Sequence, residues 1–220
     1  MHYTIIIPIY NEEKLVPQLL NELKYYSKEN QILVINDGST DSSNKILSQC
    51  NFITLKTLNK NHGKGHSVRV GIKEAYYDKI LITDGDLELK TSDLLKFMIL
   101  DKSNNINVAL GDRFNKIEVF KSIWNFGNYF FKVIFNTLHS SKLNDVLCCA
   151  KSFYKNDINL DSINSKGFDI DIELNSYLIQ KFNNVNIIPL SYTRRNTNEG
   201  KKVSLYDGFK ILFRVFTTRY

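Results

Sequence analysis

Three acidic side chains follow an apolar run near the middle of the chain. Asp84, Asp86 and Glu88 come directly after Ile80–Thr83, which has the composition of a buried strand. Open α/β sheets carry their ligand groups at the carboxyl ends of the strands. Carboxylates gathered at one place repel one another unless a cation lies between them, and their hard oxygens suit Mg²⁺ or Mn²⁺. Taken alone, the Asp-Gly-Asp spacing more often marks a solvated acidic turn that caps the next helix, and the sharper hypothesis is a metal site that holds a diphosphate.

Two further polar segments follow predicted strands in the same half of the chain. Asn36–Asp41 comes after the apolar run Ile32–Ile35, and Gly38 permits a tight turn there. Asn59–Ser67 is a basic, glycine-rich loop before a helix, so its backbone N–H groups can face a phosphate or a ribose. Its spacing is neither a Walker A loop nor a dinucleotide-binding fingerprint, so by itself the loop is a weak signal.

The elements that must position these segments alternate along the chain. Strands are predicted at residues 3–9, 32–35, 52–55, 79–83 and 107–110. Helices are predicted after them, with Asn11 as N-cap of the first, Ser39 or Thr40 as cap of the second, a third through Ala75 and a fourth from Thr91 to about Leu100. This alternation predicts an α/β domain with a mostly parallel central sheet and helices on both faces.

The second half has a different pattern. It predicts a long helix at about residues 118–138, an extended piece at 146–153, a helix at 171–181, a strand at 185–189 and a terminal helix from about residue 206. A chain of 220 residues with 43% hydrophobic and 24% charged residues suits one globular domain, so we expect a single domain over residues 1–220.

The formal charge of +6 comes from 29 basic and 23 acidic residues. The basic excess near the C-terminus comprises Arg194, Arg195, Lys201, Lys202, Lys210, Arg214 and Arg219. Such a concentration favours a phosphate-rich partner, whether a nucleotide, a lipid headgroup or nucleic acid. Nucleic acid ranks last, because the aromatic residues are not interleaved with the basic ones on one predicted strand face.

The cysteines and the apolar runs bear on location. Cys50, Cys148 and Cys149 form no Cys-x-x-Cys pair, and Met1 leads directly into a predicted strand, so we expect a reducing, cytoplasmic setting without structural zinc. The longest apolar stretch, residues 119–138, is interrupted by lysine and asparagine, so it predicts an amphipathic helix rather than a membrane span.

The motifs also occur in a recognisable order. They are Pro8-Ile-Tyr10-Asn11-Glu12, Asn36-Asp37-Gly38-Ser39-x-Asp41, Asn61-x-Gly63-x-Gly65, Asp84-x-Asp86-Leu-Glu88, Gly111-Asp-Arg113-Phe114, Asn144-Asp145, Gly167-Phe168 with Glu173, and Arg195 ahead of Gly200-Lys201-Lys202. Nearly end to end, the chain resembles family 2 glycosyltransferases of the GT-A fold. Within them it is most similar to the branch of dolichyl-phosphate mannose synthase and related polyprenyl-phosphate glycosyltransferases.

The resemblance implies a role for each motif. The implied donor-binding residues are Pro8, Tyr10, Asn11, Glu12, Asp37, Gly63, Gly65, Asp84 and Lys202. The implied metal ligands are Asp84, Asp86 and Glu88, and the implied catalytic residues are Asp86, Arg113, Asp145, Arg195 and Lys201. Two positions depart from the family pattern. Glu88 stands where the family often has glutamine, and Leu147 stands where it commonly has an acid.

The implied activity is an inverting, metal-dependent transfer from a UDP- or GDP-linked sugar to a polyprenyl phosphate. A saccharide hydroxyl is an alternative acceptor, for which Asp145 or Asp169 would serve as base. Nucleotide-sugar binding without turnover is a second alternative. Residues 1–114 would bind the nucleotide sugar and residues 115–220 the acceptor.

The predicted C-terminal helix is amphipathic. Its apolar face comprises Phe209, Leu212, Phe213 and Phe216, and the basic residues around it are Lys210, Arg214 and Arg219. That composition suits peripheral contact with the cytoplasmic face of a membrane. Docking of the same face on the protein core is the alternative.

Overall fold

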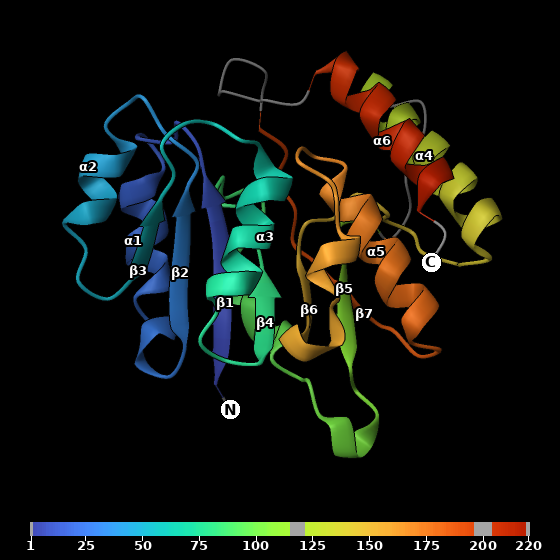
Figure 1. Ribbon diagram of the computed structural model, residues 1–220, viewed down its shortest axis with the longest axis horizontal. Coiled ribbons are helices and arrows are strands. Elements are labelled where there is room, and N and C mark those ends of the chain that lie inside the picture. Colours follow the sequence, from blue (N-terminus) through green and yellow to red (C-terminus); the bar gives the residue numbers. More distant parts are fainter. Residues whose placement is uncertain (1, 115–121, 196–203, 219–220) are drawn as a thin grey trace.

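The computed structural model describes residues 2–114, 122–195 and 204–218. A single sheet runs through it, with seven strands in the order β3-β2-β1-β4-β6-β5-β7 (Figure 1). The strands are β1 Tyr3–Ile9, β2 Gln31–Asn36, β3 Thr54–Thr57, β4 Lys79–Ile82, β5 Val108–Asp112, β6 Lys151–Tyr154 and β7 Asn186–Pro189. All pairings are parallel except those of β6, which runs antiparallel to β4 and β5. The predicted single α/β domain with a mostly parallel sheet is confirmed.

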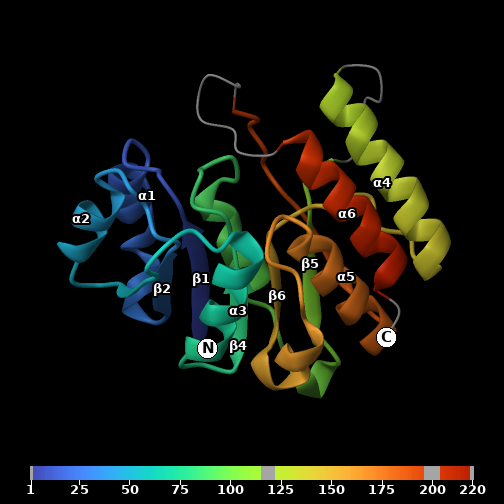
Figure 2. The ribbon, with the colours of Figure 1, turned by 45° about the horizontal axis from the view of Figure 1, so that its top comes forward.

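Helices cover both faces of the sheet, as predicted (Figures 1 and 2). The α-helices are α1 Val16–Leu23, α2 Ser43–Ser48, α3 Lys64–Glu74, α4 Ile123–His139, α5 Ile170–Lys181 and α6 Leu205–Thr217. Short 3₁₀ helices lie at Tyr26–Lys28, Thr91–Phe97, Lys102–Asn104, Lys155–Asp157 and Leu160–Ser162. α4 and α6 lie side by side at one end of the molecule, outside α5 (Figures 1 and 2).

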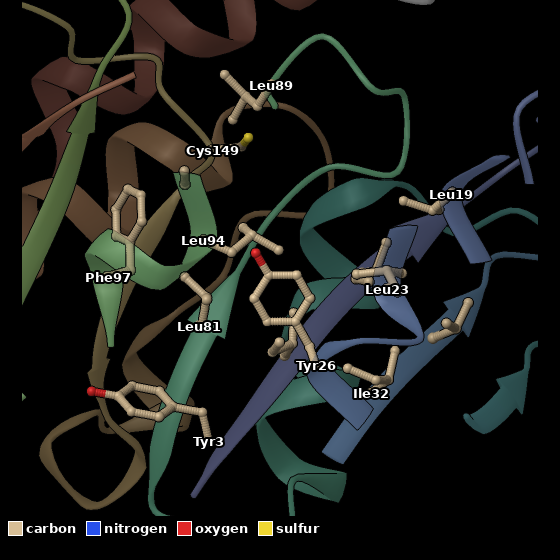
Figure 3. Close-up of a cluster of buried hydrophobic side chains, with 14 of the residues drawn as sticks. Tyr3, Leu19, Leu23, Tyr26, Ile32, Leu81, Leu89, Leu94, Phe97 and Cys149 are labelled. Atoms are coloured by element: carbon tan, nitrogen blue, oxygen red, sulfur yellow. The ribbon is translucent and has the colours of Figure 1, made fainter. Parts of the chain in front are cut away.

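The central strand β1 shows why the sheet is buried on both sides. Ile5 and Ile7 belong to a core cluster with residues of α1 and α2, while Ile6 belongs to a second cluster with residues of α3 and α5. Successive side chains of a strand point to opposite faces, so an unbroken apolar run fills both layers. Figure 3 shows part of the first cluster, including Leu23 and Tyr26. The apolar run at residues 3–9 therefore became the centre of the fold.

The expected helix caps at the ends of β1 and β2 were wrong. α1 begins at Val16 without a side-chain cap, and Asn11 has a left-handed backbone with φ 49°. The Asn11 side chain instead accepts a hydrogen bond from the Thr40 amide at 2.8 Å, and Ser39 Oγ accepts one from the Asn11 amide at 3.0 Å. α2 begins at Ser43, also without a side-chain cap. These polar side chains join two loops rather than end helices, because the parallel strands bring the loops together.

Other boundaries moved by a few residues. The helix predicted from Thr91 to Leu100 is a 3₁₀ helix that ends at Phe97, and the strand predicted at 52–55 lies at Thr54–Thr57. The long helix begins at Ile123, and its predicted start at residue 118 falls outside the described residues. The extended piece predicted at 146–153 overlaps β6, Lys151–Tyr154, whose antiparallel insertion was not predicted. In the described parts of the chain, every helix is too short or too polar to cross a bilayer.

Candidate functional site

The strand ends gather the acidic residues as the sequence predicted. A cleft of about 760 Å³ lies at the carboxyl ends of β1, β2 and β4. It is lined by the predicted residues Pro8, Tyr10, Glu12, Asp37, Gly63, Asp84, Asp86, Glu88, Arg113 and Arg195. Asp37, Asp84 and Asp86 therefore share one cleft, which is the arrangement that a diphosphate site requires.

Asp37 organises the glycine-rich loop on one wall of the cleft. Its carboxylate accepts hydrogen bonds from the backbone N–H groups of His62 and Gly63, at 2.9 and 2.8 Å. Gly63 has φ +95°, and a Cβ at that position would collide with the carbonyl oxygen of Lys166. Only glycine suits this position, because its backbone is left-handed and a neighbouring chain passes against it. The loop thus joins the end of β2 to the start of α3.

Lys64 and Asp171 were not predicted as site residues, yet both line the cleft beside Asp84. Lys64 Nζ lies 2.9 Å from Asp84 Oδ1 and 2.9 Å from Asp171 Oδ2. Asp171 also accepts from Lys151 Nζ at 3.0 Å. Burial lowers the pKa of Lys64, but the charges of Asp171 and Asp84 outweigh it and raise the pKa well above its usual value. The same two lysines overcome the effect of burial on Asp171, whose pKa is lowered.

The second acid of the motif is less well neutralised. Burial, followed by the charges of Asp84 and Glu88, raises the pKa of Asp86 to about 6. Its protein counter-ion is Arg195, whose Nη2 lies 3.2 Å from Asp86 Oδ2. Burial and the two neighbouring carboxylates together thus outweigh the lowering effect of Arg195 on the pKa of Asp86. A bound cation would relieve the repulsion between these carboxylates.

Arg195 belongs to the C-terminal half of the chain and contacts acidic residues from two segments of the N-terminal half, Glu12 and the segment with Asp86 and Glu88. Its Nη1 lies 3.1 Å from Glu12 Oε2, and its backbone N–H donates to Glu88 Oε1 at 3.0 Å. An isolated bridge between Leu89 and Tyr192 holds the backbone beside Glu88. Burial lowers the pKa of Arg195, but the neighbouring Asp86 and Glu12 carboxylates raise it overall. Arg195 is therefore a fixed positive charge in the cleft.

Arg113 lines the opposite part of the cleft and is held from behind by Asp145. Its guanidinium donates to both Asp145 oxygens, at 2.6 and 2.8 Å. Burial lowers the pKa of Arg113, and the paired Asp145 raises it to a net value well above the usual one. Asp145 does not line the cleft. The structure thus places this predicted catalytic acid one layer beneath the site.

Asp169 and Glu173, in the predicted acceptor half, also have cationic partners within the protein. Arg214 of α6 donates to Asp169 Oδ2 at 3.0 Å and to Glu173 Oε1 at 3.0 Å. Glu173 additionally accepts from the Ser165 backbone N–H at 2.7 Å. These contacts tie α6 to α5, so both carboxylates have a structural function.

Among the predicted residues that the structure describes, Asn11, Gly65, Asp145 and the alternative base Asp169 do not line the cleft. Gly65 is buried where α3 meets the Ser165 backbone, and a Cβ there would lie 2.6 Å from the Ser165 oxygen. Lys201 and Lys202 lie outside the described residues. Cleft residues that the sequence analysis did not assign include Lys64, Trp124, Lys166, Asp171, Tyr192 and Lys210. Of these residues, only Lys64 lies inside a motif from which a site role could have been predicted, between Gly63 and Gly65.

The carboxylates fit a hard cation that is shared with a ligand. Among residues 2–114, 122–195 and 204–218, no group of three or more His, Cys, Asp or Glu side chains is arranged as a ready metal site. Instead, Asp84 forms an ion pair with Lys64, and Asp86 forms one with Arg195. Mg²⁺ commonly takes one or two protein carboxylates and completes its shell with phosphate oxygens and water. The donor set and the raised pKa of Asp86 suit that second kind of site.

Comparison with solved structures identifies the fold. Mannosyl-3-phosphoglycerate synthase from Rubrobacter xylanophilus matches with a TM-score of 0.78 and 13% identity, over 99% of this chain and 72% of that one. Glucosyl-3-phosphoglycerate synthase from Mycobacterium tuberculosis, solved with Mn²⁺, UDP-glucose and phosphoglyceric acid, matches with a TM-score of 0.70 and 13% identity, over 99% and 79%. The chain thus has the GT-A fold expected from its motifs.

Curated relatives share parts of the sequence. Undecaprenyl-phosphate 4-deoxy-4-formamido-L-arabinose transferase of Proteus mirabilis is 32% identical over 94 residues, 39% of this chain and 29% of the relative. Human dolichyl-phosphate beta-glucosyltransferase is 31% identical over 133 residues, 50% of this chain and 40% of the relative. In both, the match spans less than half of the relative.

One relative aligns over almost its full length. UDP-N-acetylglucosamine–dolichyl-phosphate N-acetylglucosaminyltransferase of Methanococcus voltae is 25% identical over 240 residues, 96% of this chain and 93% of the relative. The model of the family described as glycosyl transferase family 2 matches residues 4–157, a segment that runs from the second residue of β1 to beyond β6 and includes the acidic strand ends. Because this match covers well over half of the chain, the protein belongs to glycosyl transferase family 2.

Proposed function

We propose that this protein transfers a sugar, with inversion, from a UDP- or GDP-linked donor to a polyprenyl phosphate at a membrane surface. In this proposal residues 1–114 bind the donor and residues 115–220 bind the acceptor. The observation that carries it is the convergence of Asp37, Asp84, Asp86 and Arg195 on one cleft at the strand ends. Relatives named as dolichyl- and undecaprenyl-phosphate transferases support the choice of acceptor.

The donor would lie along the strand ends. Pro8 and Tyr10 line the part of the cleft at the end of β1, where a base and a ribose would bind. The two Asp37 oxygens accept hydrogen bonds from the backbone N–H groups of His62 and Gly63. Each oxygen has a second lone pair that can accept from a ligand donor. Base and ribose binding by Pro8 and Tyr10, and ligand binding by Asp37, are assigned because these residues line the same cleft as Asp84 and Asp86.

The diphosphate would lie beside Asp84, Asp86 and Glu88, which would hold Mg²⁺ or Mn²⁺. When bound, the ion supplies Lewis-acid stabilisation of the departing diphosphate. Arg195 adds a guanidinium within the same cleft and balances the charge of the leaving group. In this proposal Lys201 and Lys202, which lie outside the described residues, would also neutralise charge on the departing diphosphate.

The state of the acidic residues favours a phosphate acceptor over a hydroxyl. A phosphate oxygen is ionised at neutral pH and attacks without a strong general base. A hydroxyl acceptor needs a free carboxylate within hydrogen-bond reach. The two predicted candidates, Asp145 and Asp169, are engaged by Arg113 and Arg214. A polyprenyl phosphate avoids that requirement.

A shallow groove beside the main cleft offers a place for such an acceptor. Its volume is about 440 Å³, and it lies between α6 and the residues just before α5. It shares Lys166 and Lys210 with the main cleft, and Phe209 and Phe213 also line it. Neither lysine has a carboxylate partner among the described residues, and Lys210 Nζ lies 4.4 Å from the centre of the Tyr206 ring, so both ammonium groups could meet a phosphate. The neighbouring phenylalanines suit an isoprenoid chain.

α6 would also contact the membrane itself. Phe209, Phe213 and Phe216 are 72%, 68% and 56% exposed, whereas Ile211 and Val215 on the other face are buried in the core. This exposure supports membrane contact over docking of the three phenylalanines on the described core. Exposed apolar residues of α4, Ile123, Phe126, Phe130 and Val133, extend the apolar surface. We place the protein peripherally at the cytoplasmic face of a membrane.

A two-stage experiment tests the proposed function. UDP-, GDP- and dTDP-sugars are first screened with Mg²⁺ or Mn²⁺ by thermal shift, because a ligand of the native state at 100 times its Kd stabilises by about 2.7 kcal/mol. The best donor, radiolabelled, is then incubated with undecaprenyl phosphate, and lipid-linked sugar is extracted. Asp86→Asn is the matched inactive variant.

The outcomes separate the alternatives. Lipid-linked label from wild type but not from Asp86→Asn supports the proposal. Donor stabilisation without transfer to lipid phosphate or saccharide would instead identify a nucleotide-sugar-binding protein. Transfer to a saccharide hydroxyl alone would replace the acceptor class, and full activity of folded Asp86→Asn would refute the assigned metal site.

A further inference from the structure

The contacts of Lys64 are unusual for a residue at the wall of a ligand cleft. Its ammonium lies at 2.9 and 3.0 Å from the two Asp84 oxygens, and at 2.9 Å from Asp171 Oδ2. Behind it, Lys151 has no exposed surface and bonds the other Asp171 oxygen at 3.0 Å. Lys64 is thus tethered from the α5 side while it faces the first acid of the motif.

The charges of this group cancel. Lys64 and Lys151 are cations, and Asp84 and Asp171 are anions, so this network of four residues, buried at Lys151 and Asp171 and open to the cleft at Asp84, is neutral. Asp84 already has a cation at contact distance. A divalent ion that binds Asp84 must therefore share this carboxylate with the Lys64 ammonium group or displace that ammonium group. Repulsion between the two cations is stronger where water is excluded.

A diphosphate changes this balance. Lys64 lines the same cleft as Asp86, Glu88 and Arg195, so an anionic ligand there meets the lysine directly. Phosphate oxygens add the negative charge that both the ammonium and the metal require. The Asp171 bond holds the lysine at the cleft while its contact with Asp84 is exchanged for one with phosphate.

We propose that Lys64 is an internal counter-ion of Asp84 that keeps metal affinity low in the donor-free protein and makes metal and diphosphate bind together. This inference rests on the proposed function, because it assumes a metal at Asp84. In this role Lys64 affects the metal through Asp84 and meets the diphosphate directly. It explains why no ready metal site exists among the described residues although three carboxylates line the cleft.

The test is direct measurement of Mn²⁺ binding by electron paramagnetic resonance, without nucleotide and with UDP or GDP, whichever strengthens Mn²⁺ binding to wild type. Lys64→Met and Lys64→Gln remove the charge, and Lys56→Met removes a lysine from an exposed 3.5 Å pair with Glu74 as control. In the absence of nucleotide, both Lys64 variants should bind Mn²⁺ at least 10-fold more tightly than wild type and Lys56→Met. The factor by which the nucleotide strengthens Mn²⁺ binding should fall by a similar ratio.

Several results would overturn the inference. Folded Lys64 variants with unchanged or weaker Mn²⁺ affinity refute the counter-ion role, and failure of both variants to fold, judged by circular dichroism, makes Lys64 a structural ion instead. The proposed function fails separately if wild type binds no Mn²⁺ with either UDP or GDP. If wild type binds Mn²⁺ with one of these nucleotides and the Lys64 variants match it in every condition, only the counter-ion inference is lost.

Discussion

Arg113 Nε donates to Asp145 Oδ2 at 2.6 Å while Nη2 donates to Oδ1 at 2.8 Å, so the guanidinium and the carboxylate form a bidentate pair. The Arg113 backbone N–H also donates to Oδ2, and the Leu147 backbone N–H donates to Oδ1. Asp145 is therefore fully engaged within the protein. Its function in this arrangement is to orient Arg113 at the cleft wall.

Asp145→Ala should cost about 3–5 kcal/mol in the free energy of unfolding, because it leaves the Arg113 charge buried without a partner. Urea denaturation at pH 7 measures this loss. The control is Lys56→Ala, which removes one member of an exposed pair and should cost at most about 1 kcal/mol. A folded Asp145→Ala variant of wild-type stability that lacks transfer would restore Asp145 as a catalytic base.

Asp93 supports the segment that carries Arg195. Its carboxylate accepts from the Ser191 backbone N–H at 2.6 Å and lies 2.7 Å from Lys96 Nζ. Burial raises the pKa of Asp93, but Lys96 and Ser191 outweigh burial and lower it from the usual 3.8. A depressed pKa in the folded protein stabilises above the unfolded pKa, and this stability is lost as the pH falls through the folded value.

Asp93→Asn should therefore destabilise at pH 7 by about 1 kcal/mol, because the neutral amide oxygen can still accept from Ser191 but the charge assistance and the ion pair with the half-exposed Lys96 are lost. The difference from wild type should shrink as the pH falls below 3.8. Chemical denaturation at a series of pH values tests this, with the exposed Asp161→Asn as control. An Asp93→Asn deficit that stays constant down to the acid limit would show that its charge is unimportant.

The groove makes a prediction about the acceptor. Replacing both Lys166 and Lys210 by serine should raise the KM for undecaprenyl phosphate at least about 10-fold, since each charge-assisted phosphate contact contributes roughly 1.5–3 kcal/mol. The KM for the sugar donor should change much less. Lys45→Ser on α2, an exposed lysine at the other end of the sheet, is the control. Equal acceptor KM values for the double variant and wild type would move the acceptor elsewhere.

The exposed face of α6 makes a prediction about membranes. Phe213→Ser with Phe216→Ser should reduce flotation with anionic liposomes several-fold, because both side chains are more than half exposed and would enter the interface. Tyr76→Ser removes an aromatic that is 80% exposed outside α4 and α6 and should float like wild type. Unchanged flotation of the double phenylalanine variant would exclude anchoring by this face.

Some features were accessible from the sequence because they depend on local order. The apolar run at 3–9 and the acids at 84 and 86 predict a central strand and a charged strand end, and parallel strands must bring such ends to one edge. The periodicity of residues 171–181 likewise matched α5, which begins at Ile170. In each case a neighbouring stretch of chain supplies the information.

Other features depend on partners that are distant along the chain. Asn11 has the residue type of a helix cap, but its amide oxygen binds the Thr40 amide, 29 positions away. Asp145 has the residue type of a base, but it is buried against Arg113. The exposure of Phe213 was decided only when α6 packed its opposite face against the core.

The sequence by itself determined the family, the α/β layering and the acidic strand ends, because hydrophobic period and motif order are properties of adjacent residues. Tertiary structure alone decided which charges meet. Lys64 and Asp171 are 107 positions apart and touch only because α3 and α5 cover the same face of the sheet. Ion pairs depend on distances of a few ångströms, and only the packed elements set those distances.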